Sequence, residues 1–250
     1  MSLANFFNLP DMARMTGVRA TWRVVAALGA HFGTAENLDG RRASRSPTRP
    51  LPFRAHESRL PGYIMMIGLR GCPNVQGGVE RHVEQLAPLI AESGCRVEVI
   101  ARKPYVGARS RWRNVAITPL WAPRVSSLEA IVHTGFAVFY AAVRRPDIVH
   151  IHAIGPSLLA PFARLLGLRV VVTHHGFDYD RAKWGRFAKF ILKAGEHCGM
   201  RFSNARIAVS ASIAETVEGR FRRKVVPIPN GVSIGPDIIP RSRDNPKILG

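Results

Sequence analysis

The stretch Tyr63-Ile-Met-Met-Ile-Gly-Leu-Arg-Gly-Cys-Pro-Asn-Val-Gln-Gly-Gly-Val-Glu-Arg-His82 decides the fold. It begins with a short apolar run, which is typical of a strand buried on both faces. After the glycine-rich loop, Val79, Val83, Leu86 and Ile90 recur at helical spacing, and Gly94 is placed as a helix stop. The pattern predicts a strand, a loop and a helix over 79–91, which together form the first part of a βαβ unit.

The same alternation continues along the chain. Apolar periodicity predicts strands over 96–101, 147–151, 169–173, 205–209 and 224–228, and helices over 157–166, 184–202 and 212–221. Residues 102–146 are less regular, and 131–143 within them suit a buried or interfacial helix. Strands separated by helices of this length form right-handed parallel crossovers. The predicted fold class is α/β: a Rossmann-like open parallel sheet with helices on both faces.

The two ends of the chain differ from this domain. Residues 1–61 hold a segment rich in Pro, Ser and Arg at 40–52 and one candidate helix at 18–32, so we interpret them as an irregular extension. Residues 62–233 form the predicted domain. Residues 234–250 are interpreted as the beginning of a linker to a second domain.

Charge and cysteine content narrow the function classes. The formal net charge is +19, from 36 Lys and Arg against 17 Asp and Glu. A basic surface favours acidic partners such as nucleic acid, anionic lipid or phosphorylated substrates. Three cysteines without CxxC spacing indicate neither a disulfide framework nor a zinc knuckle, which fits a reducing cytoplasm. No run in the sequence approaches the roughly 20 apolar residues that span a bilayer.

Ligands of open parallel sheets bind beyond the carboxyl ends of the strands, so the loops there are the first candidates for a site. Gly77 and Gly78 stand where the first helix begins, and uncovered backbone amides at a helix start form an anion site. The alternative is a tight turn that needs glycine for its conformation alone. The spacing from Gly71 to Gly77 does not match the dinucleotide fingerprint GxGxxG, and the loop lacks the GK[ST] of a P-loop.

Histidines mark two further strand ends. His150 and His152 are two residues apart on a strand, so they share one face, as a metal pair would. A metal site needs a third and a fourth ligand, and the preferred interpretation is a polar sheet end beside an anionic ligand. His174 and His175, followed by Gly176, suit hydrogen bonding to a sugar hydroxyl or phosphate, or proton transfer.

Taken in order, these segments resemble the amino-terminal domain of the family-four GT-B glycosyltransferases. The motifs are Gly77-Gly-Val-Glu-Arg-His82, Pro146-Asp-Ile-Val-His-Ile-His152, Val172-Thr-His-His-Gly176, Ala208-Val-Ser210 and Ile228-Pro-Asn-Gly-Val232. Gly71-Cys-Pro-Asn-Val-Gln-Gly-Gly-Val-Glu80 and Gly176-Phe-Asp-Tyr-Asp-Arg-Ala-Lys-Trp-Gly185 are similar to members that build bacterial capsular polysaccharides or exopolysaccharides. Each motif alone is loose, but five in the right order are specific.

The resemblance implies transfer of a sugar from a nucleoside-diphosphate donor to a saccharide or lipid-linked acceptor, with no metal or other cofactor required. It implies that His175 is the catalytic residue that touches the transferred sugar. Gly77 and Gly78 are expected beside the donor diphosphate and the acceptor.

Other residues are carried over from the same resemblance. His174, Asp178 and Arg181 are expected to face the acceptor, and Asn230 and Gly231 to form the hinge toward a second domain. Because the donor-binding domain of the family is expected to begin about where the chain stops, we expect a fragment that is inactive in transfer on its own. A cytoplasmic protein is expected, with contact between its basic surface and an anionic inner membrane face as a further hypothesis.

Two other functions stay open. An NADP-dependent Rossmann oxidoreductase would use Arg102 to bind the 2′-phosphate, and Tyr179 and Lys183 have the Tyr-x-x-x-Lys spacing for proton delivery, although the glycine fingerprint is missing. A basic nucleic-acid-binding module is suggested by charge alone, without a stacked-aromatic platform or a reading helix. From the resemblance, the partners we expect are a nucleotide sugar and an acceptor. We expect no nucleic acid.

Overall fold

The computed structural model describes residues 62–230 except 125 and 183. The interpretations of 1–61 and of 234–250 lie outside the described residues. The expected hinge residue Gly231 lies outside them as well.

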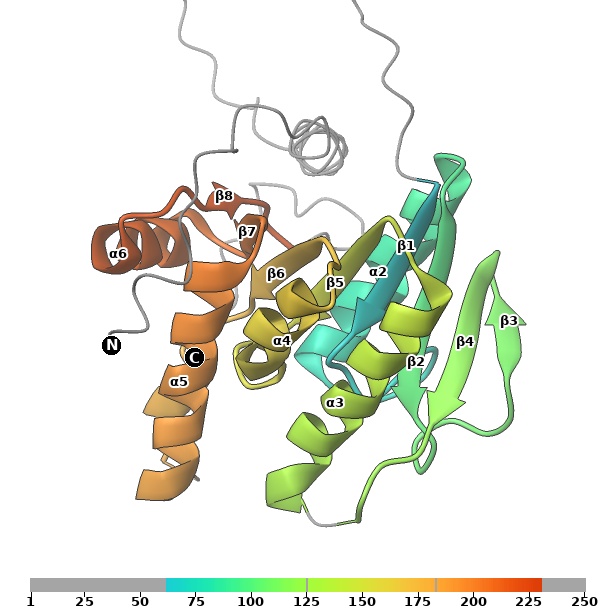
Figure 1. Ribbon diagram of the computed structural model, residues 1–250, viewed down its shortest axis with the longest axis horizontal. Helices are drawn as coiled ribbons and strands as arrows, with labels where there is room; N and C mark the ends of the chain where they lie inside the picture. The colour runs from blue at the N-terminus through green and yellow to red at the C-terminus, as the bar shows by residue number, and fades with distance from the viewer. Residues whose placement is uncertain (1–61, 125, 183, 231–250) are drawn as a thin grey trace, which may run out of the picture.

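The described residues form an eight-stranded sheet of order β3-β4-β2-β1-β5-β6-β7-β8 (Figure 1). Neighbouring strands are parallel except for β3 and β4. The predicted α/β class and the Rossmann-like sheet are confirmed. The strands are β1 Tyr63–Ile67, β2 Arg96–Arg102, β3 Ser110–Trp112, β4 Val115–Leu120, β5 Ile148–His152, β6 Val170–His174, β7 Ala205–Ala208 and β8 Val226–Pro227.

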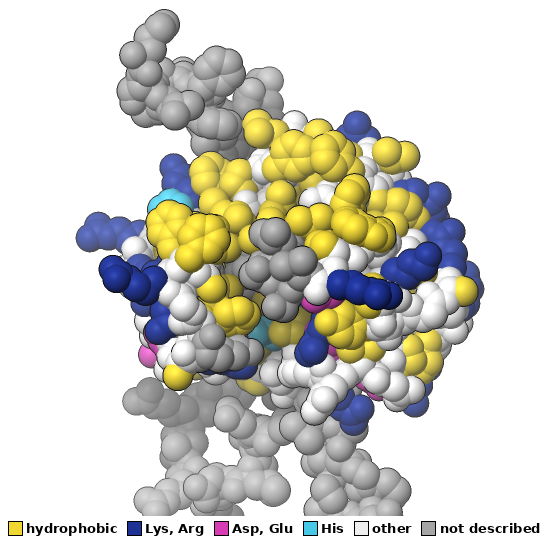
Figure 2. Space-filling model, turned by 90° about the horizontal axis from the view of Figure 1, so that it is seen from below, with side chains coloured by type: hydrophobic (Ala, Val, Ile, Leu, Met, Phe, Trp, Pro, Cys, Tyr) yellow, Lys and Arg dark blue, Asp and Glu magenta, His cyan; other side chains and the backbone are white. Residues whose placement is uncertain are grey.

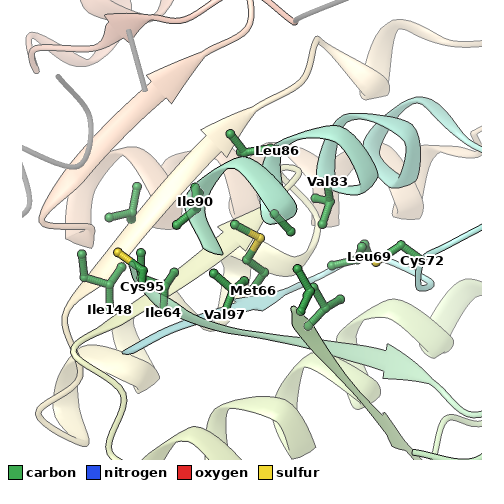
Figure 3. Close-up of a cluster of buried hydrophobic side chains, with 14 of the residues drawn as sticks. Ile64, Met66, Leu69, Cys72, Val83, Leu86, Ile90, Cys95, Val97 and Ile148 are labelled. Carbon is green, nitrogen blue, oxygen red and sulfur yellow. The ribbon is translucent and has the colours of Figure 1, made fainter. Parts of the chain in front are cut away.

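Helices cover both faces of the sheet, as the sequence predicted. Side chains alternate between the faces along β1: Ile64 and Met66 pack with α2 (Figure 3), whereas Met65 and Ile67 pack in the cluster that includes α3 to α6. This alternation is the period of two that a strand buried on both sides requires. The helices are α2 Gly78–Glu92, α3 Ser126–Arg144, η3 Pro156–Leu159, α4 Ala160–Leu165, η4 Asp178–Asp180, α5 Arg186–Phe202 and α6 Ala211–Phe221.

The region that is irregular in the sequence contains a hairpin, which the sequence analysis did not predict. Strand β3 pairs antiparallel with β4, and Trp112 lies opposite Val115. The two residues between them, Arg113 and Asn114, have φ of 44° and 64°. Two consecutive residues with positive φ form the type I′ turn that suits a tight hairpin. The hairpin adds an antiparallel edge strand to the sheet.

The strand order reverses at β1. The chain leaves β1 through α2 to β2 on one side, and β5 lies on the other side of β1. Ligands of open parallel sheets bind at such a switch point, beyond the carboxyl ends of the strands. The loop after β1 and the last residue of β5 are therefore the places to search for a site.

Candidate functional site

The loop between β1 and α2 is held by one ion pair. Nε of Arg70 lies 3.1 Å from Oε1 of Glu80, and the backbone N–H of Arg70 donates to the same oxygen at 3.1 Å. Nη2 of Arg70 also donates to the carbonyl of Gln76 at 2.6 Å. Because the Glu80 side chain is buried, this network fixes the loop that leads into the helix.

The backbone requires glycine at only one of the two glycine positions at the start of α2. Gly77 has φ of 149°, and a Cβ added there would meet the Glu80 carboxylate and Nη2 of Arg70. Gly78 is helical, and an added Cβ would have no heavy atom of the described residues within 4 Å. The turn therefore requires Gly77, whereas Gly78 leaves open space directly at the helix start.

Three imidazoles from three elements meet beside this loop. They belong to His82 on α2, His152 at the end of β5 and His175 directly after β6. Their ring centres are 5.0 Å apart for His82 and His175, 5.5 Å for His152 and His175, and 5.8 Å for His82 and His152. Nδ1 of His152 lies 3.2 Å from Nε2 of His175, within hydrogen-bonding distance. Figure 2 shows the molecule from below relative to Figure 1, and part of a histidine surface is visible there in a recess.

All three imidazoles are uncharged at neutral pH. Burial lowers the pKa of His82 to about 4 and that of His175 to about 2, and the neighbouring imidazoles lower the latter further. The pKa of His152 lies well below its usual value for the same two reasons. A neutral imidazole offers one N–H donor and one lone pair, so the cluster presents hydrogen-bonding groups and metal-ligand atoms without positive charge.

His150 lies behind this cluster on the same strand face. Its ring centre is 4.1 Å from that of His152, which confirms that the two side chains share a face. Nε2 of His150 is 2.7 Å from Oγ1 of Thr173 on β6, and both side chains are buried. His150 therefore supports the ring of His152 from inside the protein.

The side chain of His174 lies outside the cluster that contains His175. Consecutive residues at a strand end point to opposite faces, and His174 is fully buried, with Nε2 3.1 Å from Oε1 of Glu196 on α5. The backbone N–H of Gly176 donates to its Nδ1 at 3.2 Å. Both nitrogens already have partners in the protein, so the geometry gives His174 a positioning role, and the predicted contact with an acceptor is not tested by it.

The other predicted residues occupy the loop after β6 and the last described segment. Asp178 pairs with Arg181 at 3.2 Å, and the Arg181 side chain is largely exposed. The exposed Asn230 forms a side-chain hydrogen bond with His82, which brings one of the two expected hinge residues to the imidazole cluster. The acceptor role of Asp178 and Arg181 stays a prediction.

Sequence reasoning did not select His82 as a site residue, although a signal was present. His82 lies four residues after Gly78 on the same helix, and residues four apart share one helix face. A side chain one turn below an open helix start is well placed to meet a ligand bound there.

Two of the residues that the oxidoreductase hypothesis needs, Arg102 and Tyr179, have partners inside the protein, and Lys183 lies outside the described residues. Arg102 is buried, and its Nη1 lies 3.3 Å from Oε2 of Glu129. The hydroxyl of Tyr179 is bonded to Glu196 and Arg220 in the interior. Neither group is presented to a cofactor, so the structure does not favour this alternative.

Comparison with known proteins decides the family. The family described as Glycosyltransferase Family 4 matches residues 76–235, which is more than half of the chain. The chain belongs to glycosyltransferase family 4. This membership makes it a glycosyltransferase by family and confirms the resemblance to family four, while the finer likeness to members that build capsular polysaccharides or exopolysaccharides stays a prediction.

Solved structures agree with this family 4 assignment in fold. A sucrose-phosphate synthase from Thermosynechococcus elongatus is similar with a TM-score of 0.53 and 18% identity, over 66% of this chain and 47% of that protein. The family 4 chain thus spans about half the length of that synthase and has the fold of one GT-B half. A second sucrose-phosphate synthase structure from the same organism (TM-score 0.48, 15% identity, 68% and 88% coverage) and a UDP-N-acetylglucosamine 2-epimerase from Rickettsia bellii (0.41, 11%, 65% and 43%) are more distant. No curated protein matches the chain.

Proposed function

We propose that this domain binds a nucleoside-diphosphate sugar at the start of α2 and supports transfer of the sugar to a saccharide or lipid-linked acceptor in surface-polysaccharide synthesis, without a metal. The observation that carries the proposal is the open helix start at Gly78 next to uncharged imidazoles. Both features lie at the switch point between β1 and β5, where this fold class binds ligands.

The helix start supports binding of a diphosphate. Helix α2 has 15 residues, and its N-cap residue is Gly77, which has no side chain. The first backbone N–H groups of the helix therefore receive no hydrogen bond from a capping side chain. With the helix dipole, such amides stabilise an anion by about 0.3–1 kcal/mol per charge when exposed, and more when partly buried. A diphosphate has the charge and the oxygens that this position favours.

The imidazole of His175 suits contact with a sugar rather than proton transfer. With a pKa of about 2 the ring is uncharged at neutral pH, so it has no imidazolium proton with which to act as a general acid, and it is a poor base for the same reason. A neutral ring held by His152 can still donate or accept a hydrogen bond with a hydroxyl. We therefore assign His175 to orientation of the transferred sugar.

A matched pair of glycine variants tests the diphosphate site. Gly78→Ala should weaken binding of the nucleotide sugar about tenfold, because a methyl group enters the space of the phosphate and one 1.4 kcal/mol step is tenfold in affinity. Gly219→Ala on α6 is the control, because an added Cβ there also meets nothing within 4 Å among the described residues. UDP-glucose and GDP-mannose serve as probes, with binding followed by saturation-transfer NMR on the whole chain.

The stability of the two variants separates binding from folding. Ala is a better helix residue than Gly by about 0.5–1 kcal/mol, so neither variant should unfold at lower urea than the wild type. Equal affinity of Gly78→Ala and wild type would remove the diphosphate from this position. Lack of binding of both nucleotide sugars to the wild-type chain up to millimolar concentration would overturn the proposed donor class.

A membrane surface is the second partner that we propose. Helix α3 exposes Phe136, Phe139 and Val143 at i, i+3 and i+7, with exposed fractions of 50%, 57% and 82%, and Trp121 packs edge-on against Phe136. Hydrophobic side chains gather with Lys and Arg around them in Figure 2. Among the described residues no helix combines the length and the apolar character needed to cross a bilayer.

This combination favours adsorption to an anionic lipid surface at the cytoplasmic face. Exposed aromatic groups enter the interface, and each Lys or Arg near an anionic surface adds about 1 kcal/mol. The net charge of +19 makes that term large. A lipid-linked acceptor would then lie in the same plane as the bound protein.

Vesicle sedimentation tests this partner. The chain should sediment with phosphatidylglycerol vesicles and not with phosphatidylcholine vesicles, and Phe136→Ser combined with Phe139→Ser should lower recovery several-fold. Phe202→Ser is the control, because Phe202 is also exposed but lies at the end of α5. Equal recovery with both lipids, or an unchanged double variant, would end the hypothesis.

A further inference from the structure

We propose that His82, His152 and His175 form a binding site for one Zn²⁺ ion or a similar transition-metal ion. The site goes beyond the proposed function, in which sugar transfer uses no metal. Each of the three residues offers one nitrogen, and these three nitrogens lie within 4.8 Å of one another.

The arrangement of the rings fits the size of such an ion. A triangle with sides of 5.0, 5.5 and 5.8 Å has its centre about 3.2 Å from each corner. An imidazole nitrogen lies about 1.1 Å from its ring centre, so an ion at the centre would lie about 2 Å from three inward-turned nitrogens, which is the Zn–N bond length.

One pair of ligand atoms is already in place. Nδ1 of His152 and Nε2 of His175 are 3.2 Å apart, about the separation of two nitrogens on one tetrahedral zinc ion. The third ligand would be His82, whose ring is nearly perpendicular to that of His175, with an interplanar angle of 75°. One nitrogen of His82 already lies within 4.8 Å of both.

The surroundings of the three rings match those of a metal site. The backbone positions are fixed by a helix and two neighbouring strands, so the rings are held by a rigid frame. His82 hydrogen bonds to Asn230, the kind of outer contact that orients a metal-ligating imidazole.

The donor set predicts the selectivity. Three uncharged imidazole nitrogens suit Zn²⁺, Ni²⁺ or Cu²⁺, whereas Mg²⁺ and Ca²⁺ require oxygen ligands. Three histidines leave a fourth position for water or an anion, as in zinc sites that are open to a ligand. His175 is the least buried of the three residues, so a fourth ligand would reach the ion from its side.

The experiment measures metal binding by the whole chain in the absence of nucleotide sugar. Titration with Co²⁺ should produce the intense visible absorption of a tetrahedral ion, Zn²⁺ should displace it with one ion per chain, and Mg²⁺ should not. His82→Gln and His175→Gln should each weaken Zn²⁺ binding by at least about tenfold. Far-UV circular dichroism checks that each variant is folded, and the half-exposed His175 provides the test if the His82 variant does not fold.

Controls exclude binding elsewhere on the chain. His197→Gln removes an exposed imidazole on α5, and Cys198→Ser removes the least buried of the three thiols. A double variant of His31 and His56 removes the two histidines outside the described residues. All three should bind Zn²⁺ as the wild type does. The proposal is overturned if the wild type binds no Zn²⁺ at micromolar concentration, or if His82→Gln and His175→Gln bind it as tightly as the wild type.

One consequence rests on the proposed function. If His175 contacts the transferred sugar, coordination of Zn²⁺ by His175 would occupy the imidazole that the sugar needs. Zn²⁺ should therefore weaken binding of the nucleotide sugar several-fold in the wild type but not in His82→Gln. Zn²⁺ binding without this competition would count against the sugar contact of His175 and leave the metal site standing.

Discussion

Replacement of Glu196 by Gln should destabilise the domain by about 2 kcal/mol. The Glu196 side chain on α5 is 3% exposed and accepts hydrogen bonds from Nε2 of His174 at 3.1 Å, the Tyr179 hydroxyl at 3.2 Å and Nη1 of Arg220 at 2.9 Å. Hydrogen bonds to a charged group contribute about 1.5–3 kcal/mol. Gln keeps the shape and one acceptor oxygen but loses the negative charge that pairs with Arg220.

The magnitude stays below that of a fully buried ion pair. Removal of one partner of such a pair costs about 3–5 kcal/mol because the other charge is left buried. The Arg220 side chain is 46% exposed and can turn to water, so this larger cost does not apply. For a domain of this size, about 2 kcal/mol corresponds to a melting temperature lower by roughly 4–8 °C.

The pH dependence gives the prediction a second readout. Burial raises the pKa of Glu196, but the hydrogen bond from His174 and the charge of Arg220 outweigh burial and leave that pKa below its usual value. A carboxyl group with a lowered folded-state pKa stabilises the fold above its unfolded pKa of about 4.3, and this contribution is lost as the pH falls through the folded pKa. The difference in unfolding free energy between wild type and Glu196→Gln should therefore shrink below about pH 4. Urea unfolding followed by circular dichroism measures it, and a difference that is absent at pH 7, or unchanged in acid, would refute the reasoning.

Three further predictions concern local features. Gly77→Ala should lower the urea midpoint, because the new Cβ meets Glu80 at a φ of 149°, and a midpoint equal to that of Gly78→Ala would contradict the assigned turn. Asn114→Val should cost about 1–2 kcal/mol, because a β-branched residue replaces one with φ of 64° in the β3–β4 turn, whereas Asn114→Gly should be tolerated; equal stabilities would argue against the type I′ hairpin. Burial raises the pKa of Cys72 to about 12, so mass spectrometry should find it unmodified by maleimide at pH 7 in the native chain and modified in urea; rapid native labelling would show that the loop opens.

Much of the fold was predictable because the apolar residues of most strands and helices recur at the spacing typical of each element. The run at Tyr63–Ile67 and the helical spacing that follows it gave β1 and α2 nearly to the residue. The hairpin of β3 and β4 was missed because β3 is three residues long and its turn, Arg113-Asn114, lacks the glycine that usually marks such a turn. A strand that short has no measurable period.

The meeting of histidines at the strand ends was predictable from the sequence, but the full membership of the cluster was not. The rule that ligands bind beyond the strand ends selected the loop at Gly77 and the strand ends at His152 and His175, and the rings of these two histidines lie 5.5 Å apart. It also selected His174, although two consecutive strand residues cannot face the same side. The contribution of His82 depends on how α2 crosses the sheet, and that packing is a tertiary property that spacing along one element does not contain.

The two glycines at the start of α2 show why a motif should be divided into its residues before a function is assigned to it. The sequence offered two explanations for the pair, a turn that needs glycine and an approach for an anion, and each explanation fits a different member. Gly77 has the positive φ and the crowded neighbours of a conformational glycine. Gly78 has neither, and nothing within the described protein forbids a side chain there. A glycine that folding does not require, at an uncapped helix start, is what the proposed binding of a diphosphate at this position predicts.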